Sequence, residues 1–161
     1  QARLNGCRVV FDNNFRPKLW PDRILAQEVY RQAFAACHTA MITLDDHQAV
    51  FDCATLEEAL LHAQSLAIPE VVIKRGAADT LVRQESSSKW ESIPTLPVNQ
   101  VIDTTAAGDS FAAGYLSRRL CGVSAKMAVI FSNALAARVI QHRGALIPME
   151  AMQDLLSDPV N

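Results

Sequence analysis

The residues best suited to chemistry lie in one short segment, Asp103-Thr104-Thr105-Ala106-Ala107-Gly108-Asp109-Ser110-Phe111. The segment leads into a predicted helix over residues 108–120. The first turn of a helix carries unpaired N–H groups and a partial positive charge. The small residues Ala106, Ala107 and Gly108 would let a phosphate approach those amides closely. Asp109 would lie beside that phosphate, where a carboxylate can take the proton of an attacking hydroxyl.

Other interpretations of this segment remain open. An aspartate in a first turn also stabilises a helix without any ligand, and small residues also permit close packing. Gly108-Asp109-Ser110 matches the nucleophile block of lipase-like esterases, but Ser110 would then need a histidine and an acid. No Asp-x-x-His follows it, and His142 is the only late histidine. The two common glycine-rich nucleotide motifs are also missing from the sequence.

Apolar runs that alternate with helical patterns must position this segment. The order predicts an α/β fold, a mostly parallel sheet with helices on both faces, in a single domain over residues 1–161. Short apolar runs predict strands at 9–11, 40–44, 71–74, 80–83 and 89–93, the last two paired with each other. Helices are expected after Trp20-Pro21-Asp22, after a capping box of Thr55 and Glu58, and over 108–120 and 124–142. The predicted inner faces are Leu25, Val29, Ala33 and Ala36 in the first helix and Phe111, Tyr115, Leu116 and Leu120 in the third.

Composition excludes several classes of protein. Of 161 residues, 50% are hydrophobic and 20% charged, and the net charge is −2, which excludes a disordered chain and argues against a nucleic-acid partner. No stretch approaches the roughly 20 apolar residues of a membrane span, so we expect a soluble, cytoplasmic protein. The four cysteines and four histidines show no zinc-ligand spacing, so the sequence predicts buried cysteines and no zinc site.

Three segments in order resemble one protein family. Asp103–Phe111 resembles the signature of ribokinase-like (PfkB-type) sugar kinases, although Ala106 stands where the family usually has glycine. Together with Asp12–Trp20 and Lys74–Ala77, it is most similar to the branch that phosphorylates 2-keto-3-deoxygluconate. The chain matches the C-terminal, nucleotide-side half of that branch. The resemblance implies ATP and Mg²⁺ as cofactors, a sugar acid as the small-molecule partner, and a homo-oligomer.

The resemblance also implies roles for particular residues. Asp109 would be the general base and Arg16 would lie beside the transferred phosphate, both counting as catalytic. Asp46 would hold Mg²⁺ through a water, in a Thr-x-x-Asp segment that replaces the family's Asn-x-x-Glu. The residues expected to contact the nucleotide are Asn14, Arg16, Lys74, Gly76, Ala77, Ala106, Ala107, Gly108 and Asn133.

Structural roles compete with several of these assignments. Arg16 could be a solvated side chain or stack on Trp20, and Lys74 could be a strand-end lysine that extends to solvent. Asn133 could bond to its own helix, and Asp46 could cap the following helix. The whole chain could also be a truncated, non-catalytic module that binds nucleotide without the sugar-binding half.

Overall fold

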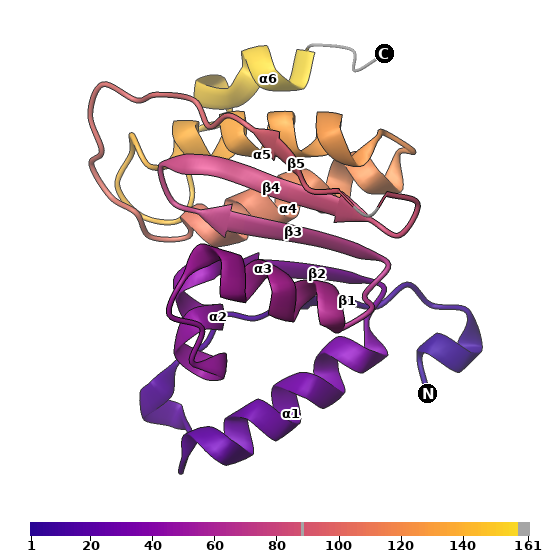
Figure 1. The fold of residues 1–161 in the computed structure, drawn as a ribbon. Helices are drawn as coiled ribbons and strands as arrows, with labels where there is room; N and C mark the ends of the chain where they lie inside the picture. Colours follow the sequence, from indigo (N-terminus) through magenta and orange to yellow (C-terminus); the bar gives the residue numbers. More distant parts are fainter. Residues whose placement is uncertain (88, 158–161) are drawn as a thin grey trace. The chain divides into compact units, whose positions relative to one another are not determined.

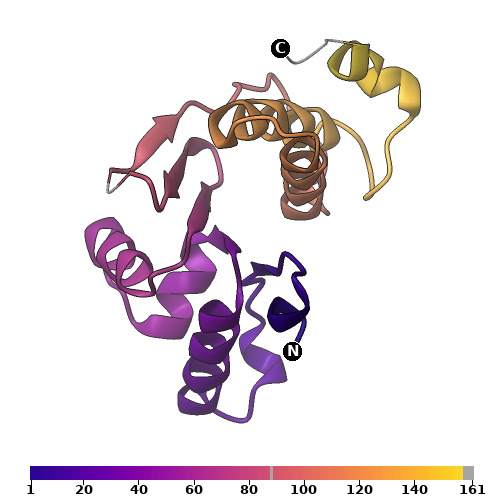
Figure 2. The same ribbon diagram turned by 90° about the vertical axis from the view of Figure 1, so that its right-hand side faces the viewer.

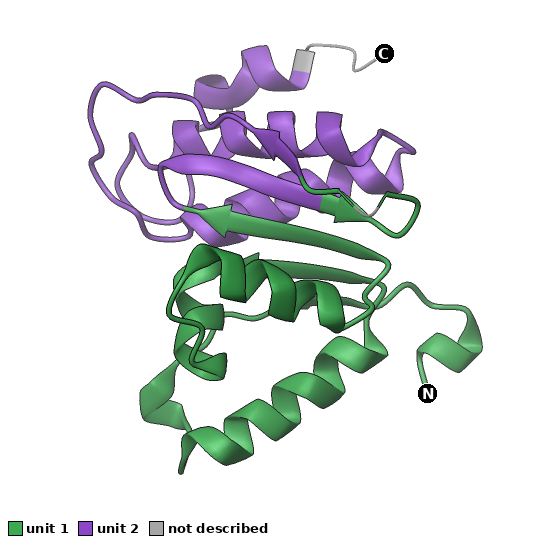
Figure 3. Ribbon diagram, in the orientation of Figure 1, with its two compact units in different colours: residues 1–75, 83–90 green, residues 76–82, 91–161 purple. Residues whose placement is uncertain are grey.

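The structure is a computed structural model that describes residues 1–87 and 89–157. Its contacts divide the chain into two compact units (Figure 3). Unit 1 comprises Gln1–Arg75 and Arg83–Trp90, and unit 2 comprises Gly76–Val82 and Glu91–Asn161. The single domain over residues 1–161 stays a prediction.

Unit 1 contains three parallel strands that are joined by helical crossovers (Figure 1). Phe11 of the first strand pairs with Ala40, and Met41 of the second pairs with Val72. Parallel strands need such crossovers because the chain must return from the end of one strand to the opposite end of the sheet before the next strand begins. In chain order the elements are η1 (Arg3–Asn5), β1 (Val10–Asp12), η2 (Pro17–Leu19), α1 (Arg23–Ala36), β2 (Thr39–Thr43), α2 (Leu44–Phe51), α3 (Leu56–Ser65) and β3 (Glu70–Arg75).

The middle strand of unit 1, β2, is buried on both sides. Ala40, Met41 and Ile42 in β2 are all 0% exposed. Since successive side chains of a strand point to opposite faces, both faces of β2 are covered. The predicted strand, and the covering of both its faces, are thus confirmed.

Helix α1 begins where the sequence predicts but buries a different face. The Asp22 side chain accepts a hydrogen bond from the Leu25 amide at 2.8 Å and so caps the helix. Leu25 and Val29 are 45% and 40% exposed, so the predicted inner face is wrong. The buried residues of α1 are Ala26, Tyr30 and Phe34.

An aromatic cluster explains why α1 buries this other face. The rings of Tyr30 and Phe34 contact Phe11 edge to face, with centroids 5.5 and 5.1 Å away. Tyr30 also contacts Phe15 and Trp20 in the same manner. Large rings bury more apolar area than leucine or valine, and their edge-to-face contacts add about 0.5–1.5 kcal/mol per pair. The aromatic face is therefore the one that turns inward.

Unit 2 contains most of β4 (Ala78–Gln84), together with β5 (Glu91–Ile93), α4 (Ala107–Leu120), α5 (Ala125–Val139), η3 (Met149–Met152) and α6 (Gln153–Ser157). β4 and β5 pair antiparallel, with Thr80 opposite Ile93, as the sequence predicts. Helices α4 and α5 lie side by side (Figures 1 and 2). Gly114 permits this contact, because a Cβ there would lie 3.2 Å from side-chain atoms of both Leu135 and Ser132.

Three sequence expectations need correction or comment. Leu120 is 80% exposed, so it is not part of the inner face of α4, which consists of Phe111, Gly114 and Tyr115. Two cysteines, Cys7 and Cys121, are exposed rather than buried. None of the helices in the described part of the chain is long and apolar enough to cross a bilayer.

Candidate functional site

The predicted site residues of unit 1 follow the carboxyl ends of its parallel strands, where open α/β sheets bind ligands. A buried asparagine joins two of these ends. Asn13, 2% exposed, donates through Nδ2 to the Thr43 carbonyl at 3.0 Å and accepts from the Thr43 amide at 2.8 Å. The loop after β1 and the start of α2 are therefore held together. Sequence reasoning missed this role of Asn13, although its place after a buried strand was a signal.

Asp46 lies in the first turn of α2 and reaches back to the loop after β1. Its Oδ2 accepts a hydrogen bond from the Phe15 amide at 3.1 Å and lies 3.9 Å from Arg16 Nη1. Burial raises the pKa of this carboxyl, although the Phe15 amide and the Arg16 guanidinium oppose that shift. Thr43 is the N-cap residue of α2, so the alternative role of Asp46 as a cap is wrong.

Arg16 and Lys74 differ in how firmly they are held. The Arg16 side chain is 58% exposed, and its Nη1 donates to the Phe15 carbonyl at 3.0 Å. Lys74 is only 12% exposed and pairs with Asp12 through a 2.8 Å contact. The alternative of a lysine extending to solvent is therefore wrong, whereas most of the Arg16 side chain remains accessible.

Asn14 has an unusual backbone at the same edge. Its φ of 27° is positive, and its amide donates to the side chains of Asp12 and Asn13. Positive φ is uncommon outside glycine, and asparagine is among the residues that tolerate it best. The Asn14 side chain makes no hydrogen bond among the described residues and is exposed.

The segment of unit 2 that leads into α4 has a left-handed residue at the helix start and two free amides after it. Ala106 is the N-cap residue, with φ 59° and ψ 16°, a left-handed conformation that favours glycine. The Ala107 amide donates to the Thr104 carbonyl at 3.2 Å. The amides of Gly108 and Asp109 have no hydrogen-bond partner among the described residues. These two N–H groups are therefore free to bind an anion.

Asp109 is exposed in the first turn of α4. Its carboxylate forms no hydrogen bond or ion pair with any described residue. Exposed carboxylates and the first amides of a helix are ordinarily bonded to water, so both groups are accessible to a ligand here. The pair can bind an anion and accept a proton in the same turn.

Asp103 fixes the approach to α4, a role that sequence reasoning did not assign. Its carboxylate accepts from the amides of Thr105 and Gly144, each at 2.8 Å. Hydrogen bonds from the side chain and amide of Thr105, and then from Gly144, lower its pKa to about 2. The contact to Thr105 is an Asx-turn, which the Asp-Thr-Thr sequence could have indicated.

Asn133 in α5 uses both ends of its amide inside unit 2. Its Oδ1 accepts from Thr80 Oγ1 at 2.9 Å, and its Nδ2 donates to the Pro94 carbonyl at 3.1 Å. Asn133 is 6% exposed. The alternative of a bond to its own helix is therefore wrong. The contacts favour a positioning role over the direct adenine contact that the resemblance implies.

The turn between β3 and β4 carries two further predicted residues. Gly76 has φ 60°, and a Cβ there would meet nothing within 4 Å. The Ala77 carbonyl accepts a hydrogen bond from Thr95 Oγ1 at 2.6 Å. The backbone conformation thus favours glycine at position 76, and the turn is held to the segment after β5.

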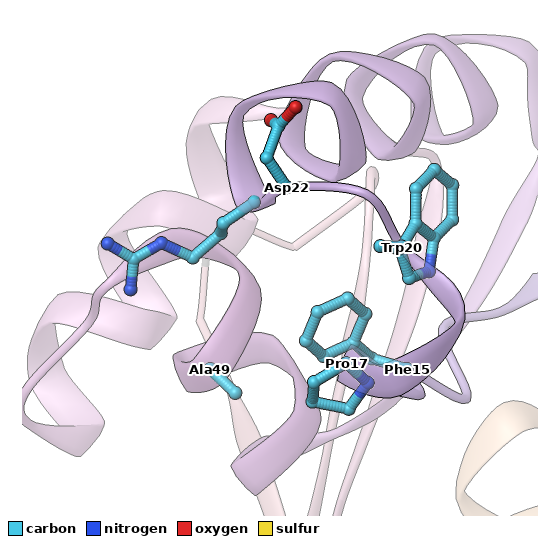
Figure 4. Close-up of a pocket in the computed structure, with 6 residues that line it drawn as sticks. Phe15, Pro17, Trp20, Asp22 and Ala49 are labelled. Carbon is cyan, nitrogen blue, oxygen red and sulfur yellow. The ribbon is translucent and has the colours of Figure 1, made fainter.

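Two other candidate sites are weaker. An open pocket of about 280 Å³ in unit 1 is lined by Phe15, Pro17, Trp20, Asp22, Arg23 and Ala49 (Figure 4). Its two charged residues are engaged, because Asp22 caps α1 and Arg23 pairs with Asp52. In unit 2, the Ser110 hydroxyl donates to the Ala107 carbonyl at 2.9 Å, so it is not activated by a histidine as an esterase nucleophile would be.

An α/β fold and a helix start with small residues and free amides are features common to α/β proteins that bind phosphate groups. A family comparison narrows this class. The model of the pfkB family carbohydrate kinases matches residues 1–152, and the chain belongs to this family.

Curated relatives give more detail. The chain is 44% identical to 2-dehydro-3-deoxygluconokinase of Escherichia coli (strain K12) and 45% identical to that of Dickeya dadantii. Each match covers 94% of this chain and 50% or 49% of the relative. The chain therefore spans about half the length of the curated relatives it matches.

Solved structures confirm the ribokinase-like α/β fold. Fructokinase from Vibrio cholerae O395, with fructose, ADP and calcium ion bound, is 26% identical with a TM-score of 0.83. That match covers 98% of this chain and 52% of the fructokinase. Aminoimidazole riboside kinase from Salmonella enterica, with aminoimidazole riboside and an ATP analog, is 24% identical with a TM-score of 0.84, covering 97% and 54%.

Proposed function

We propose that this protein transfers the γ-phosphoryl group of ATP to the 6-hydroxyl of 2-keto-3-deoxygluconate, which is also called 2-dehydro-3-deoxygluconate. The observation that carries the proposal is the partnerless Asp109 carboxylate beside the free amides of Gly108 and Asp109 at the start of α4. The substrate rests on the names of the relatives, which are 44% and 45% identical to this chain.

In the proposed reaction, the 6-hydroxyl oxygen of the sugar attacks the γ-phosphorus. An O–P bond forms, the bond from the γ-phosphorus to the β–γ bridging oxygen breaks, and ADP leaves. Asp109 accepts the hydroxyl proton. The amides of Gly108 and Asp109 bind the phosphate oxygens, and such fixed donors typically contribute 10²–10³-fold each. The predicted set also contains Ala106 and Ala107, but the Ala107 amide already donates to the Thr104 carbonyl.

The groups of unit 1 have supporting roles in this proposal. Arg16 has an exposed, planar guanidinium that matches phosphate oxygens and would stabilise the charge of the transferred group. Lys74 would contact the nucleotide while its ion pair with Asp12 holds it in place. Asn14, Gly76 and Ala77 would contact the nucleotide, while Asn133 would position the segments around it.

Asp46 fits a role as a magnesium ligand. Its carboxylate is 23% exposed, and one oxygen is engaged by the Phe15 amide. Mg²⁺ usually keeps several waters and binds one or two carboxylates together with substrate phosphates. Asp46 would therefore hold the ion through a water. When bound, Mg²⁺ neutralises charge on the phosphate oxygens.

A coupled assay of ADP release, with ³¹P NMR of the product, tests the proposed function. We expect turnover with 2-keto-3-deoxygluconate and a phosphate ester at C6. The matched control is the same sugar acid without the 6-hydroxyl, which we expect to give only background ATP hydrolysis. Fructose, which is bound in one of the solved relatives, has no carboxylate and therefore tests whether the reaction requires the carboxylate of the sugar acid. Equal ADP release with and without the sugar acid would contradict the proposal.

The relatives matched are kinases, and no observation favours the non-catalytic nucleotide-binding module. A homo-oligomer and a cytoplasmic location, where ATP is available, are part of the proposal.

A further inference from the structure

Unit 1 brings together three metal-binding side chains that the proposed reaction does not use. His47, Cys53 and His62 each offer one ligand atom, and these atoms all lie within 4.8 Å of one another. The spacing His-x₅-Cys-x₈-His matches no common zinc pattern, so the sequence predicts no site. The fold nevertheless brings the three side chains together.

The two histidines of the group form an unusual pair. His62 Nδ1 lies 3.0 Å from His47 Nε2. His47 is 1% exposed, and its Nδ1 has no hydrogen-bond partner in the described structure. Two imidazoles can share only one proton in such a contact, and a buried polar atom without a partner is costly. One N–H···N hydrogen bond can satisfy both facing nitrogens, so the metal-binding potential of the pair comes from the closeness of these nitrogens and of the cysteine sulfur.

Local structure holds the three residues in place. His47 lies on α2 and His62 on α3, and Cys53 lies in the connection between these helices. The connection turns sharply because Asp52 has φ 57°, a left-handed conformation. A complete capping box between Thr55 and Glu58 then fixes the start of α3. The group is thus built from two helices and one short loop.

The distances fit a tetrahedral ion after a small adjustment. With Zn–N bonds of about 2.0–2.1 Å and a Zn–S bond of about 2.3 Å, ligand atoms lie about 3.4–3.6 Å apart. The two histidine nitrogens, now 3.0 Å apart, must separate by a few tenths of an ångström. The cysteine sulfur, within 4.8 Å of them, must move inward by at most about 1 Å.

The charges around the group also suit a cation. Asp52 and Glu58 lie close enough to Cys53 to raise the pKa of its thiol, although burial raises it more. Burial lowers the pKa of both imidazoles, that of His47 to about 3, so both are in the neutral form that binds metals. The positive charge of Arg31 lowers the pKa of His62 further and disfavours a nearby cation. The Arg31 guanidinium lies over the Phe51 ring.

From this geometry we propose that His47 Nε2, His62 Nδ1 and the Cys53 thiolate bind one Zn²⁺ ion, with water as the fourth ligand. The ion displaces the thiol proton of Cys53 to solvent and ties α2 to α3. Because His62 is only partly buried, water can reach the fourth position. The site is independent of the proposed kinase chemistry.

Metal binding by the chelator-treated chain tests this site. Zn²⁺ is titrated in competition with a chromophoric chelator, and Co²⁺ is used as a spectroscopic substitute. We expect about one Zn²⁺ per chain and a thiolate-to-cobalt charge-transfer band. Cys53→Ser should abolish the band, and both Cys53→Ser and His62→Asn should weaken Zn²⁺ binding at least about 10-fold, the loss that even outer-shell changes cause. Cys121→Ser and His142→Asn are the matched controls and should bind as the original chain does.

Two results would overturn the site. One is a folded original chain that binds no stoichiometric Zn²⁺; the other is binding that Cys53→Ser and His62→Asn leave unchanged. Circular dichroism checks that each variant folds. If Cys53→Ser does not fold, the cobalt spectrum of the original chain and of Cys121→Ser decides, because a missing thiolate band in both contradicts the proposal.

Discussion

Each unit has a group of polar residues at its candidate site, and the two groups differ in how far neighbouring residues engage them. In unit 1, Asn13, Asp46 and Lys74 are all engaged by neighbouring groups of the same unit. In unit 2, the Asp109 carboxylate and the amides of Gly108 and Asp109 have no partner in the described structure. Engaged groups hold a geometry, whereas free groups are available to react. In the proposed reaction, unit 1 would mainly supply fixed charges and unit 2 would supply the proton acceptor.

The largest expected effect is on the free carboxylate. Asp109→Asn keeps the shape but loses the proton acceptor, so we expect kcat to fall by about 10²–10⁴-fold, the usual contribution of a general base. ATP affinity should change by less than about threefold, since a base contributes little to binding. Steady-state kinetics with an ATP-binding titration measures both.

Glu57→Gln is the control for this prediction, because Glu57 is also an exposed acid in a helix first turn, that of α3. It should leave kcat unchanged. Undiminished turnover in Asp109→Asn would remove Asp109 from the role of base.

Like the Asp109 carboxylate of unit 2, the Arg16 side chain of unit 1 is largely accessible. Because its side chain is 58% exposed, Arg16→Ala should cost about 10²-fold in kcat, as for loss of one charge-stabilising donor. The free energy of unfolding should change by less than about 1 kcal/mol. Lys18→Ala, an exposed cation in the same loop, is the control. If urea unfolding shows that Arg16→Ala loses stability in proportion to activity, Arg16 is structural.

Asn13 is an engaged residue, so we expect its substitution to lower stability. Asn13→Ala removes both hydrogen bonds of its side chain to the partly buried Thr43 backbone, at about 1–3 kcal/mol for each group left unsatisfied. We expect a loss of about 3 kcal/mol in unfolding free energy. Asn14→Ala, which removes no side-chain hydrogen bond, should cost about 1 kcal/mol or less. Equal losses in urea titrations of the two variants would mean that Asn13 does not join β1 to α2.

The smallest effect concerns the engaged carboxylate of unit 2, Asp103. Its pKa of about 2 lies below the ordinary 3.8, so the ionised form is favoured in the folded state. The stability that its hydrogen bonds supply is therefore present above about pH 4 and lost as pH falls through about 2. We expect Asp103→Asn to lower stability at pH 7 and to differ less from the original chain near pH 2. NMR titration of the Asp103 carboxyl measures the midpoint directly, and a midpoint near 3.8 would contradict the assignment.

Sequence patterns could predict what depends on neighbours along the chain. The capping box of Thr55 and Glu58, the start of α4 before Asp109 and the pairing of β4 with β5 each depend on a few adjacent residues. The matching PfkB family model confirms the family that the motif at Asp103–Phe111 indicates.

Contacts between distant segments could not be predicted in this way. The Lys74–Asp12 pair joins residues 62 positions apart and requires the register of the parallel strands. The group of His47, Cys53 and His62 depends on how α2 and α3 approach each other. The face of α1 was predicted wrongly because helical spacing does not reveal that the rings of Tyr30 and Phe34 outweigh Leu25 and Val29.

The most direct test of the account is an ¹H–¹⁵N NMR titration of the protein with a non-hydrolysable ATP analogue and Mg²⁺. The amide signals of Gly108 and Asp109 should shift at the lowest analogue concentrations, and Gly122, in the loop after α4, should serve as an unaffected reference. Binding of the analogue that leaves the Gly108 and Asp109 signals in place would contradict the claim that the start of α4 binds the phosphate.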